Sequence, residues 1–340
     1  MRKFFIIFFF TCLANSIFAQ DPHFSQFFAS PLTLNPAFTG KFDGTMRLAG
    51  NYRNQWPTIN RAYVTTTASV DFPILKKLVQ NNDTWGLGFM GYSDKSANGA
   101  VAFNYFSAST AFHKGLDEDG YTQLGFGMQG TYSNMNIYPN KLTFEDQLTP
   151  LGFTGPTSEV FNGTTLSKSF LDINAGLLLS TSSTDRNNLY AGISLYHINR
   201  PKQKFLGNTD SAVYLLQPRA TFHAGGFFPV SANSALHISA LYSSQAKAHE
   251  TVIGGAFQIA TDDLATAENP TSLYVGAWMR LGDALIPFAS LEFNNFRVGI
   301  SYDVNTSSLR TASQSRGGFE LSLIYIAKPP GSKGIPCPKF

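Results

Sequence analysis

The stretch MRLAGNYR, residues 46–53, alternates between apolar and polar side chains. Successive side chains of a β-strand point to opposite faces, so a period of two predicts a strand whose two faces meet different surroundings. The polar face carries two arginines and could line the interior of a barrel. The apolar set is Met46, Leu48 and Tyr52, and the polar set is Arg47, Asn51 and Arg53.

The same alternation recurs from about residue 45 to residue 327, without an amphipathic helix of useful length. No apolar run of about eighteen residues follows the first twenty, so no transmembrane helix is expected. An even number of strands of this length predicts an all-β fold, a transmembrane antiparallel β-barrel of about 14 strands. The predicted strands begin near Thr45, Tyr63, Thr84, Val101, Tyr121, Asp172, Leu189, Arg219, Ala235, His249, Ser272, Ala284, Phe296 and Phe319.

A soluble β-sandwich and a β-solenoid are the alternative folds. No repeat of fixed period is visible, which argues against a solenoid. Charged residues make up only 14% of the chain and aromatic residues another 14%, whereas a sandwich of this size normally carries more charge on its solvated faces. The composition therefore favours the membrane barrel.

Long and short connections alternate along the chain, as they do in membrane barrels, whose outer loops are long and whose periplasmic turns are short. With both chain ends in the periplasm, the long connections 135–171, 200–218 and 304–318 fall outside. The short turns 182–188, 229–234 and 294–295 fall inside. The two-residue turn at 282–283 would lie outside and is an exception to this trend.

Both chain ends carry signals of their own. Met1-Arg2-Lys3 followed by apolar Phe4–Phe10 and a cleavage site near Ala19 predicts a signal peptide, residues 1–19. Its removal leaves a net charge of about +1, which gives no reason to expect a nucleic-acid partner. Residues 328–340 are rich in proline and cannot join a strand ladder, so we expect a periplasmic tail. The predicted location is the cell outer membrane.

Neither a cofactor nor catalysis is predicted. GFGMQG, residues 125–130, matches a dinucleotide fingerprint by letter, but it lies inside an alternating strand and no helix follows. Its glycines would instead allow close strand packing or leave room in the lumen. Cys337 alone survives cleavage, the histidines are scattered, and no GxSxG motif is present, so no metal site and no enzyme are expected.

The segment QDPHFSQFFASPLTLNPAFTG, residues 20–40, precedes the first strand. A residue before proline is pushed out of helical space, so Ser30-Pro31 and Asn35-Pro36 predict an extended, kinked arm with aromatic anchors. Residues 20–44 would form a periplasmic arm, or would fold inward as a plug. We expect the loss of residues 20–40 to impair docking of periplasmic partners more than barrel assembly.

This segment resembles the N-terminal signature of the PorP/SprF family, outer-membrane proteins of the type IX secretion system of Bacteroidota. YRNQWP (52–57), YDVNTSSL (302–309) and GGFELSLI (317–324) are similar to further family stretches. The resemblance implies partner-binding roles for Gln20, Asp21, Pro22, Phe24, Ser25, Gln26, Pro31, Leu34, Asn35, Pro36 and Gly40. Candidate lumen or barrel residues are Arg47, Arg53, Gln55, Trp56 and Pro57.

The sequence is compatible with two functions. The resemblance implies a non-enzymatic component that helps a large surface protein, such as an adhesin, to be exported or anchored. It also implies links to the periplasmic ring or motor and to gliding motility. Aromatic residues on the 135–171 connection, Phe144, Phe153 and Phe161, would face this cargo. The alternative is a channel or hydrophobic-ligand transporter, because a barrel of this size encloses a wide lumen.

Overall fold

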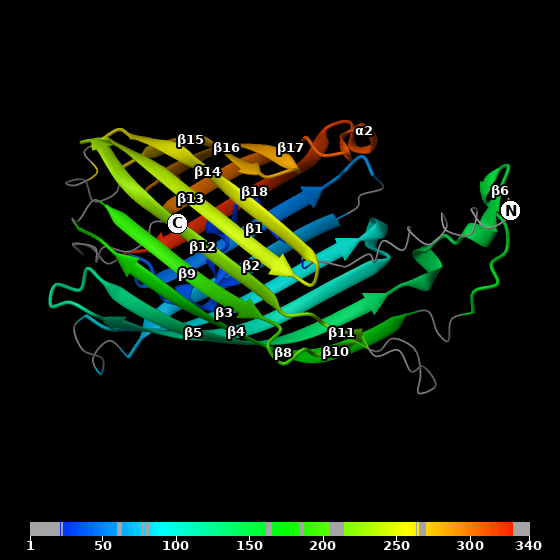
Figure 1. Cartoon of the computed structure of the whole chain (residues 1–340), viewed down its shortest axis with the longest axis horizontal. Helices are drawn as coiled ribbons and strands as arrows, with labels where there is room; N and C mark the ends of the chain where they lie inside the picture. Colours follow the sequence, from blue (N-terminus) through cyan, green and yellow to red (C-terminus); the bar gives the residue numbers. More distant parts are fainter. Residues whose placement is uncertain are drawn as a thin grey trace, which may run out of the picture.

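A computed structural model describes residues 21, 23–59, 63–75, 78, 82–160, 165–183, 187–203, 214–262, 264 and 270–328. Within them, fourteen antiparallel strands form one closed barrel, which confirms the predicted fold (Figure 1). In the same residues, no helix has the length and apolar character needed to span a bilayer. The predicted signal peptide, Cys337 and most of the proline-rich tail lie outside the described residues.

The strands of the barrel begin close to the predicted positions. The main exception is β8, which starts several residues before Asp172 and pairs with β5 from Leu166↔Ile137 onward. Its outward side chains begin with Ser167 and Ser169, so this part of the strand resembles a loop in sequence. The barrel strands are β1 (Met46–Gln55), β2 (Tyr63–Ile74), β3 (Thr84–Ser96), β4 (Val101–Gly115), β5 (Gln123–Ile137), β8 (Leu166–Thr181), β9 (Asn188–Tyr196), β12 (Arg219–Ser231), β13 (Ser234–Gln245), β14 (Ala248–Ala260), β15 (Ser272–Arg280), β16 (Ala284–Phe293), β17 (Phe296–Asn305) and β18 (Arg316–Ala327).

Side chains alternate between the two faces along most of the wall. In β18, Phe319, Leu321 and Leu323 point outward and are exposed, while Glu320 and Ser322 are buried inside. An apolar exterior suits the hydrocarbon of a bilayer, and a polar interior suits water or hydrogen-bonded protein. Closure between β1 and β18 runs in register from Met46↔Ala327 to Gln55↔Gly318, so the wall has no open edge.

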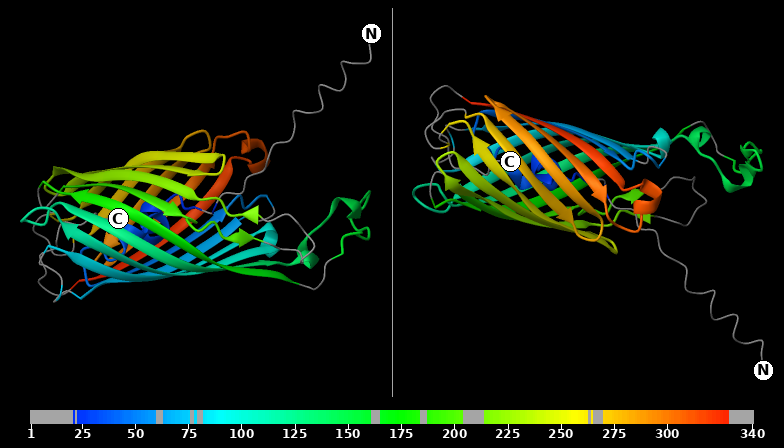
Figure 2. Two further views of the ribbon diagram at one scale, coloured as in Figure 1. Left: turned by 60° about the horizontal axis from the view of Figure 1, so that its bottom comes forward. Right: turned by 90° about the horizontal axis from the view of Figure 1, so that it is seen from above.

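The connections fall alternately at two ends of the barrel. We call the end where β1 begins and β18 ends the terminal end, and the opposite end the loop end. The loop end carries the connection 138–165, with η5 (Pro139–Lys141), η6 (Glu145–Gln147) and the small hairpin β6 (Leu148–Thr149) and β7 (Gly152–Phe153). This hairpin projects away from the barrel in Figures 1 and 2. The loop end also carries η4 (Ala97–Gly99), β10 (Lys202–Gln203), β11 (Tyr214–Leu215) and α2 (Arg310–Ser313).

The chain before β1 folds inside the barrel as three short helical turns. These are η2 (Phe27–Ala29), α1 (Pro31–Leu34) and η3 (Pro36–Phe38). The expectation of an extended arm was therefore wrong. Each proline occupies the first position of a turn, where its missing N–H is not needed, and only the residue before it is non-helical. Asn35, for example, has φ −158° and ψ 122°.

Candidate functional site

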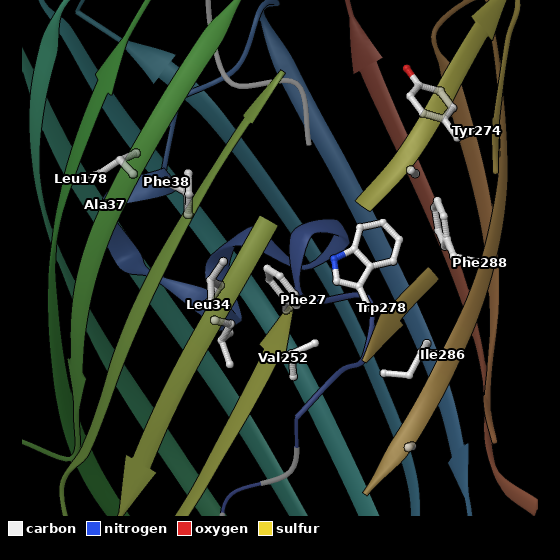
Figure 3. Packing of buried hydrophobic residues seen from close by; sticks show 13 residues of the cluster. Phe27, Leu34, Ala37, Phe38, Leu178, Val252, Tyr274, Trp278, Ile286 and Phe288 are labelled. Atoms are coloured by element: carbon white, nitrogen blue, oxygen red, sulfur yellow. The ribbon is translucent and has the colours of Figure 1, made fainter. Parts of the chain in front are cut away.

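Residues 21–44, which we call the luminal segment, cross the interior of the barrel. Its middle packs Phe27, Leu34 and Phe38 into an apolar cluster with the wall (Figure 3). Phe28 lies with its ring centroid 4.6 Å from that of Trp278 and 5.3 Å from that of Phe288. Burying one such aromatic side chain stabilises a fold by about 1.5–3 kcal/mol. The wall residues of the cluster are Leu178, Leu241, Val252, Ala256, Tyr274, Trp278, Ala284, Ile286 and Phe288.

Asn35 fixes the middle of the luminal segment. Its Oδ1 accepts the backbone N–H of Ala37 at 2.8 Å and so caps η3. Its Nδ2 lies 2.9 Å from the carbonyl oxygen of Leu177 in β8 and 3.0 Å from Nε2 of His223 in β12. The side chain is completely buried. One amide therefore caps the start of η3 and ties this turn to two strands of the wall.

Glu320 and Asp303 hold the segment nearer the loop end. The Glu320 carboxylate accepts the backbone N–H groups of Ser25 at 2.6 Å and Gln26 at 2.8 Å. Asp303 accepts the Ser25 hydroxyl at 2.8 Å. Gln26 uses its side chain as well, donating to Ser301 at 3.0 Å. Charge-assisted hydrogen bonds to buried amides are among the stronger polar contacts in proteins.

Two arginines neutralise these carboxylates. Arg53 Nη1 lies 2.7 Å from Glu320 Oε1, and its Nη2 lies 3.1 Å from Asp303 Oδ2. Arg280 Nη1 contacts Asp303 Oδ2 at 3.0 Å. Arg53 was predicted to face the lumen, whereas Arg280, Asp303 and Glu320 were not singled out. The available signal was a charged residue on the polar face of a strand whose other residues are mostly uncharged.

A second ion pair holds the segment at the terminal end. Arg47 donates to both oxygens of Asp71, at 3.0 Å from Nε and 2.9 Å from Nη2, and also to the carbonyl of Phe38. Asp71 in turn accepts the N–H of Gly40 at 2.8 Å. Gly40 has φ +72°, and a Cβ there would lie 2.6 Å from Cα of Gly86. Only glycine satisfies both constraints.

The start of the segment lies near the loop end. Asp21 Oδ2 is 2.6 Å from His197 Nε2, and His197 Nδ1 is 2.8 Å from Asp172 Oδ2. Burial alone would lower the pKa of His197, but the two carboxylates outweigh it and raise this pKa to about 9. Burial would raise the pKa of Asp21, but His197 and Arg219 hold it well below its usual value. The pair is therefore ionic at neutral pH.

The luminal segment touches all fourteen strands of the barrel. It therefore lies inside the barrel instead of projecting from it, and its start lies at the opposite end of the barrel from Lys328. Only its last residues reach the terminal end, where Lys41 donates to Gln123. One contacting residue from each strand, in chain order, is Arg53, Asp71, Tyr92, Ser109, Gln129, Leu177, Ser194, His223, Gln245, Glu250, Arg280, Phe288, Asp303 and Glu320.

Most of the residues predicted to bind partners are buried inside this barrel. Of that set, Phe24, Ser25, Gln26, Pro31, Leu34, Asn35, Pro36 and Gly40 are buried and Asp21 is half-buried, while Gln20 and Pro22 lie outside the described residues. Their partner-binding role stays a prediction. Among the lumen candidates, Arg47 and Arg53 are central to the site. Gln55 ends β1 opposite Gly318, Trp56 packs on Tyr63 at 5.8 Å, and Pro57 is exposed.

Sequence comparison identifies this architecture. The family model described as type IX secretion system membrane protein PorP/SprF matches residues 16–325. The chain belongs to this family. A PorP/SprF member with a closed fourteen-stranded barrel is an outer-membrane component of the type IX secretion system. The match includes the luminal segment as well as nearly all of the barrel wall.

Several solved barrels resemble this PorP/SprF member in shape, with little sequence in common. A FadL homologue of Pseudomonas aeruginosa is 11% identical with a TM-score of 0.47, over 87% of this chain and 94% of that one. The toluene transporter TbuX of Ralstonia pickettii is 9% identical with a TM-score of 0.48, over 87% and 91%. The toluene transporter TodX of Pseudomonas putida is 10% identical with a TM-score of 0.48, over 87% and 92%. No curated protein matches the sequence.

Cavities remain in the lumen of this PorP/SprF barrel on both sides of the luminal segment. The loop-end chamber, of about 100 Å³, lies between Asp21–Phe27 and the walls near Tyr92, Asp172 and Arg219. The terminal-end chamber, of about 50 Å³, is lined by aromatic side chains that include Phe28, Tyr274 and Trp278. In the part of the chain that the structure describes, no three His, Cys, Asp or Glu side chains gather into a group suited to a metal ion.

Proposed function

We propose that this PorP/SprF member assists the export or surface anchoring of a large secreted protein, such as an adhesin, and couples it to the periplasmic secretion machinery. The role is non-enzymatic. The observation that carries the proposal is the family match over residues 16–325 together with a closed outer-membrane barrel. The loop end then faces the cell exterior and the terminal end faces the periplasm.

Cargo contact is assigned to the loop end. The connection 138–165 exposes apolar side chains far from the wall, among them Leu151 at 88% and Val160 at 86% exposure. Phe153 is exposed on the same hairpin, Phe144 is half-buried, and Phe161 lies outside the described residues. Large exposed apolar side chains on a projecting loop are characteristic of protein-binding surfaces.

Contact with the periplasmic machinery is assigned to the terminal end. The luminal segment is a poor candidate for this contact, because its polar groups already bind the wall of the barrel. The connection 116–122 between β4 and β5 is available there, with Glu118 and Asp119 exposed. Lys328, which follows β18, also lies at this end and is 3.8 Å from Asp43.

Channel or transport activity is the alternative function. The two chambers provide space for a small ligand, but they lie on opposite sides of a segment that touches every strand. A continuous path would therefore require the luminal segment to move. Single-channel recording tests this directly, since a steady open conductance of the intact protein would favour the pore.

Site-specific photo-crosslinking in cells tests the secretion role. A photo-reactive residue at Leu151 should capture a large secreted protein, and one at Asp119 should capture periplasmic machinery. The matched control is Leu177, which points outward from β8 into the bilayer. Recovery of the same proteins at Leu177, or of neither class at the two test positions, would contradict the proposal.

A further inference from the structure

The loop-end chamber is walled by aromatic rings. Phe24 of the luminal segment packs against Tyr92 of β3 with ring centroids 6.4 Å apart, and Tyr92 packs against Tyr105 of β4 at 5.1 Å. Tyr196 closes another side and carries the guanidinium of Arg219 over its ring at 4.4 Å. Faces of such rings attract cations as well as apolar groups.

Carboxylates in the chamber wall have unused hydrogen-bonding capacity. Asp172 is 3% exposed, and while its Oδ2 binds His197, its buried Oδ1 has no hydrogen-bond partner among the described residues. Glu250 Oε2 likewise lacks a hydrogen bond there, although His23 and Arg280 lie 3.3 and 3.6 Å away. A buried carboxylate oxygen without a donor is unfavourable, so these atoms are suited to a ligand that donates hydrogen bonds.

Charge points to the same kind of ligand. The chamber is lined by three carboxylates, Asp21, Asp172 and Glu250, against the two cations His197 and Arg219. Arg219 forms an ion pair with Asp21, with Nη1 and Oδ2 3.5 Å apart. Arg280, beside Glu250, binds Asp283 and Asp303, each at 3.0 Å. Burial, followed by the charges of neighbouring arginines, lowers the pKa of His23, so this side chain adds no cation at neutral pH.

We propose that the loop-end chamber binds an ammonium group carried on a small apolar or aromatic body. The ammonium donates to Asp172 Oδ1 and Glu250 Oε2, and the body lies against Phe24, Tyr92 and Tyr105. Two sources supply this chemistry: a free amine, or a lysine side chain of a protein bound at the loop end. The site is independent of the secretion role in the first case and deepens it in the second.

Calorimetric titration of the folded barrel in detergent tests the site. Benzylamine is the cationic probe, and benzyl alcohol and benzoate are its neutral and anionic counterparts. Benzylamine should bind, benzyl alcohol should bind at least tenfold more weakly, and benzoate should not bind. Nα-acetyl-lysine amide, compared with Nα-acetyl-norleucine amide, reports on the lysine source. Tighter binding of the lysine derivative than of benzylamine assigns the site to a partner protein, and the reverse assigns it to a free amine.

Substitutions at the two carboxylates locate the binding. Asp172→Asn and Glu250→Gln should each weaken benzylamine at least tenfold, because each removes a charge-assisted hydrogen bond. Asp119→Asn, in an exposed terminal-end turn, is the matched control and should bind like the wild type. Heat-modifiable migration on gels verifies that every variant is folded, and where Asp172→Asn fails to fold, Glu250→Gln decides.

Three results would overturn the proposal: no benzylamine binding to the folded wild type, equal binding of benzyl alcohol, or unchanged binding by the folded carboxylate variants. None of these bears on secretion, which the crosslinking experiment measures in cells. Failure of the chamber site and failure of the secretion role are therefore distinguishable.

Discussion

Arg53 of β1 and Glu320 of β18 face each other in register across the line where the barrel closes, with Nη1 and Oε1 2.7 Å apart. The same Glu320 carboxylate accepts the N–H groups of Ser25 and Gln26. One side chain therefore links the first strand, the last strand and the luminal segment.

Replacing Glu320 with Gln should destabilise the barrel strongly. The change leaves Arg53 buried with one carboxylate fewer and weakens the acceptor of two backbone amides, so we expect a loss of about 3 kcal/mol or more. Urea unfolding of the reconstituted barrel, followed by tryptophan fluorescence, measures this. The control is Glu118→Gln, in an exposed turn, which should leave the unfolding midpoint unchanged. Equal midpoints for both variants would show that the closure between β1 and β18 does not depend on Glu320.

The stability contributed by the contact between Asp21 and His197 should depend on pH. The raised pKa of His197 means that its stabilisation is complete below its ordinary value of 6.5 and is lost as pH rises through about 9. The lowered pKa of Asp21 means that its stabilisation is present above its ordinary value of 3.8 and is lost at lower pH.

Unfolding midpoints measured from pH 3 to pH 10 should therefore include a contribution from this pair that is largest between roughly pH 4 and 6.5. His197→Gln should remove the part of the profile that changes between pH 6.5 and 9. NMR titration of His197 gives the pKa directly. A measured value at or below 6.5 would show that the ion pair does not form.

Two glycines of one strand should respond differently to the same substitution. A Cβ at Gly127 would overlap the backbone of Pro36 and Ala37, whereas a Cβ at Gly130 meets nothing within 4 Å. Gly127→Ala should therefore displace η3 and cost about 1–3 kcal/mol, while Gly130→Ala should be close to neutral. The measurement compares the unfolding midpoints of the two variants. Similar midpoints would show that η3 does not pack against Gly127.

Removing residues 21–40 should prevent formation of a stable barrel. The deletion leaves Asp71, Asp303 and Glu320 without their partners in the segment and empties an apolar cluster, so the expected result is little heat-modifiable protein. This reverses the expectation that loss of the segment affects docking more than assembly. Folded barrel at the wild-type yield, with an open conductance in bilayers, would instead make the segment a dispensable plug.

Much of the wall was predictable because each membrane strand alternates apolar residues that face lipid with polar residues that face the lumen. The alternation at 46–53 correctly placed Arg47 and Arg53 inside the barrel. It failed at the start of β8, where the outward positions hold Ser167 and Ser169 and the inward positions mix Leu166, Lys168 and Phe170, so the period is lost. A strand end exposed to water on both sides gives no such signal.

The luminal site could not be predicted in the same way, because its contacts join residues far apart in the chain. Asn35 binds Leu177 and His223, and Ser25 binds Asp303, and none of these pairs is implied by local sequence. The helical turns were missed for a different reason. The residue before a proline disfavours helix, which predicts an extended chain, but Pro31 and Pro36 themselves each begin a turn, where proline is favoured.

The direction of the luminal segment has a consequence for biogenesis. Asp21 lies among residues at the loop-end termini of β9, β12 and β13, whereas Lys328 follows β18 at the other end. The two ends of the described chain thus lie at opposite ends of the barrel. Because the closed wall offers no lateral entry, the segment reaches its place either before β1 meets β18 or by threading through an open end of the barrel. In either case, the residues before β1 must travel along the lumen to the loop end, while the residue after β18 stays at the terminal end.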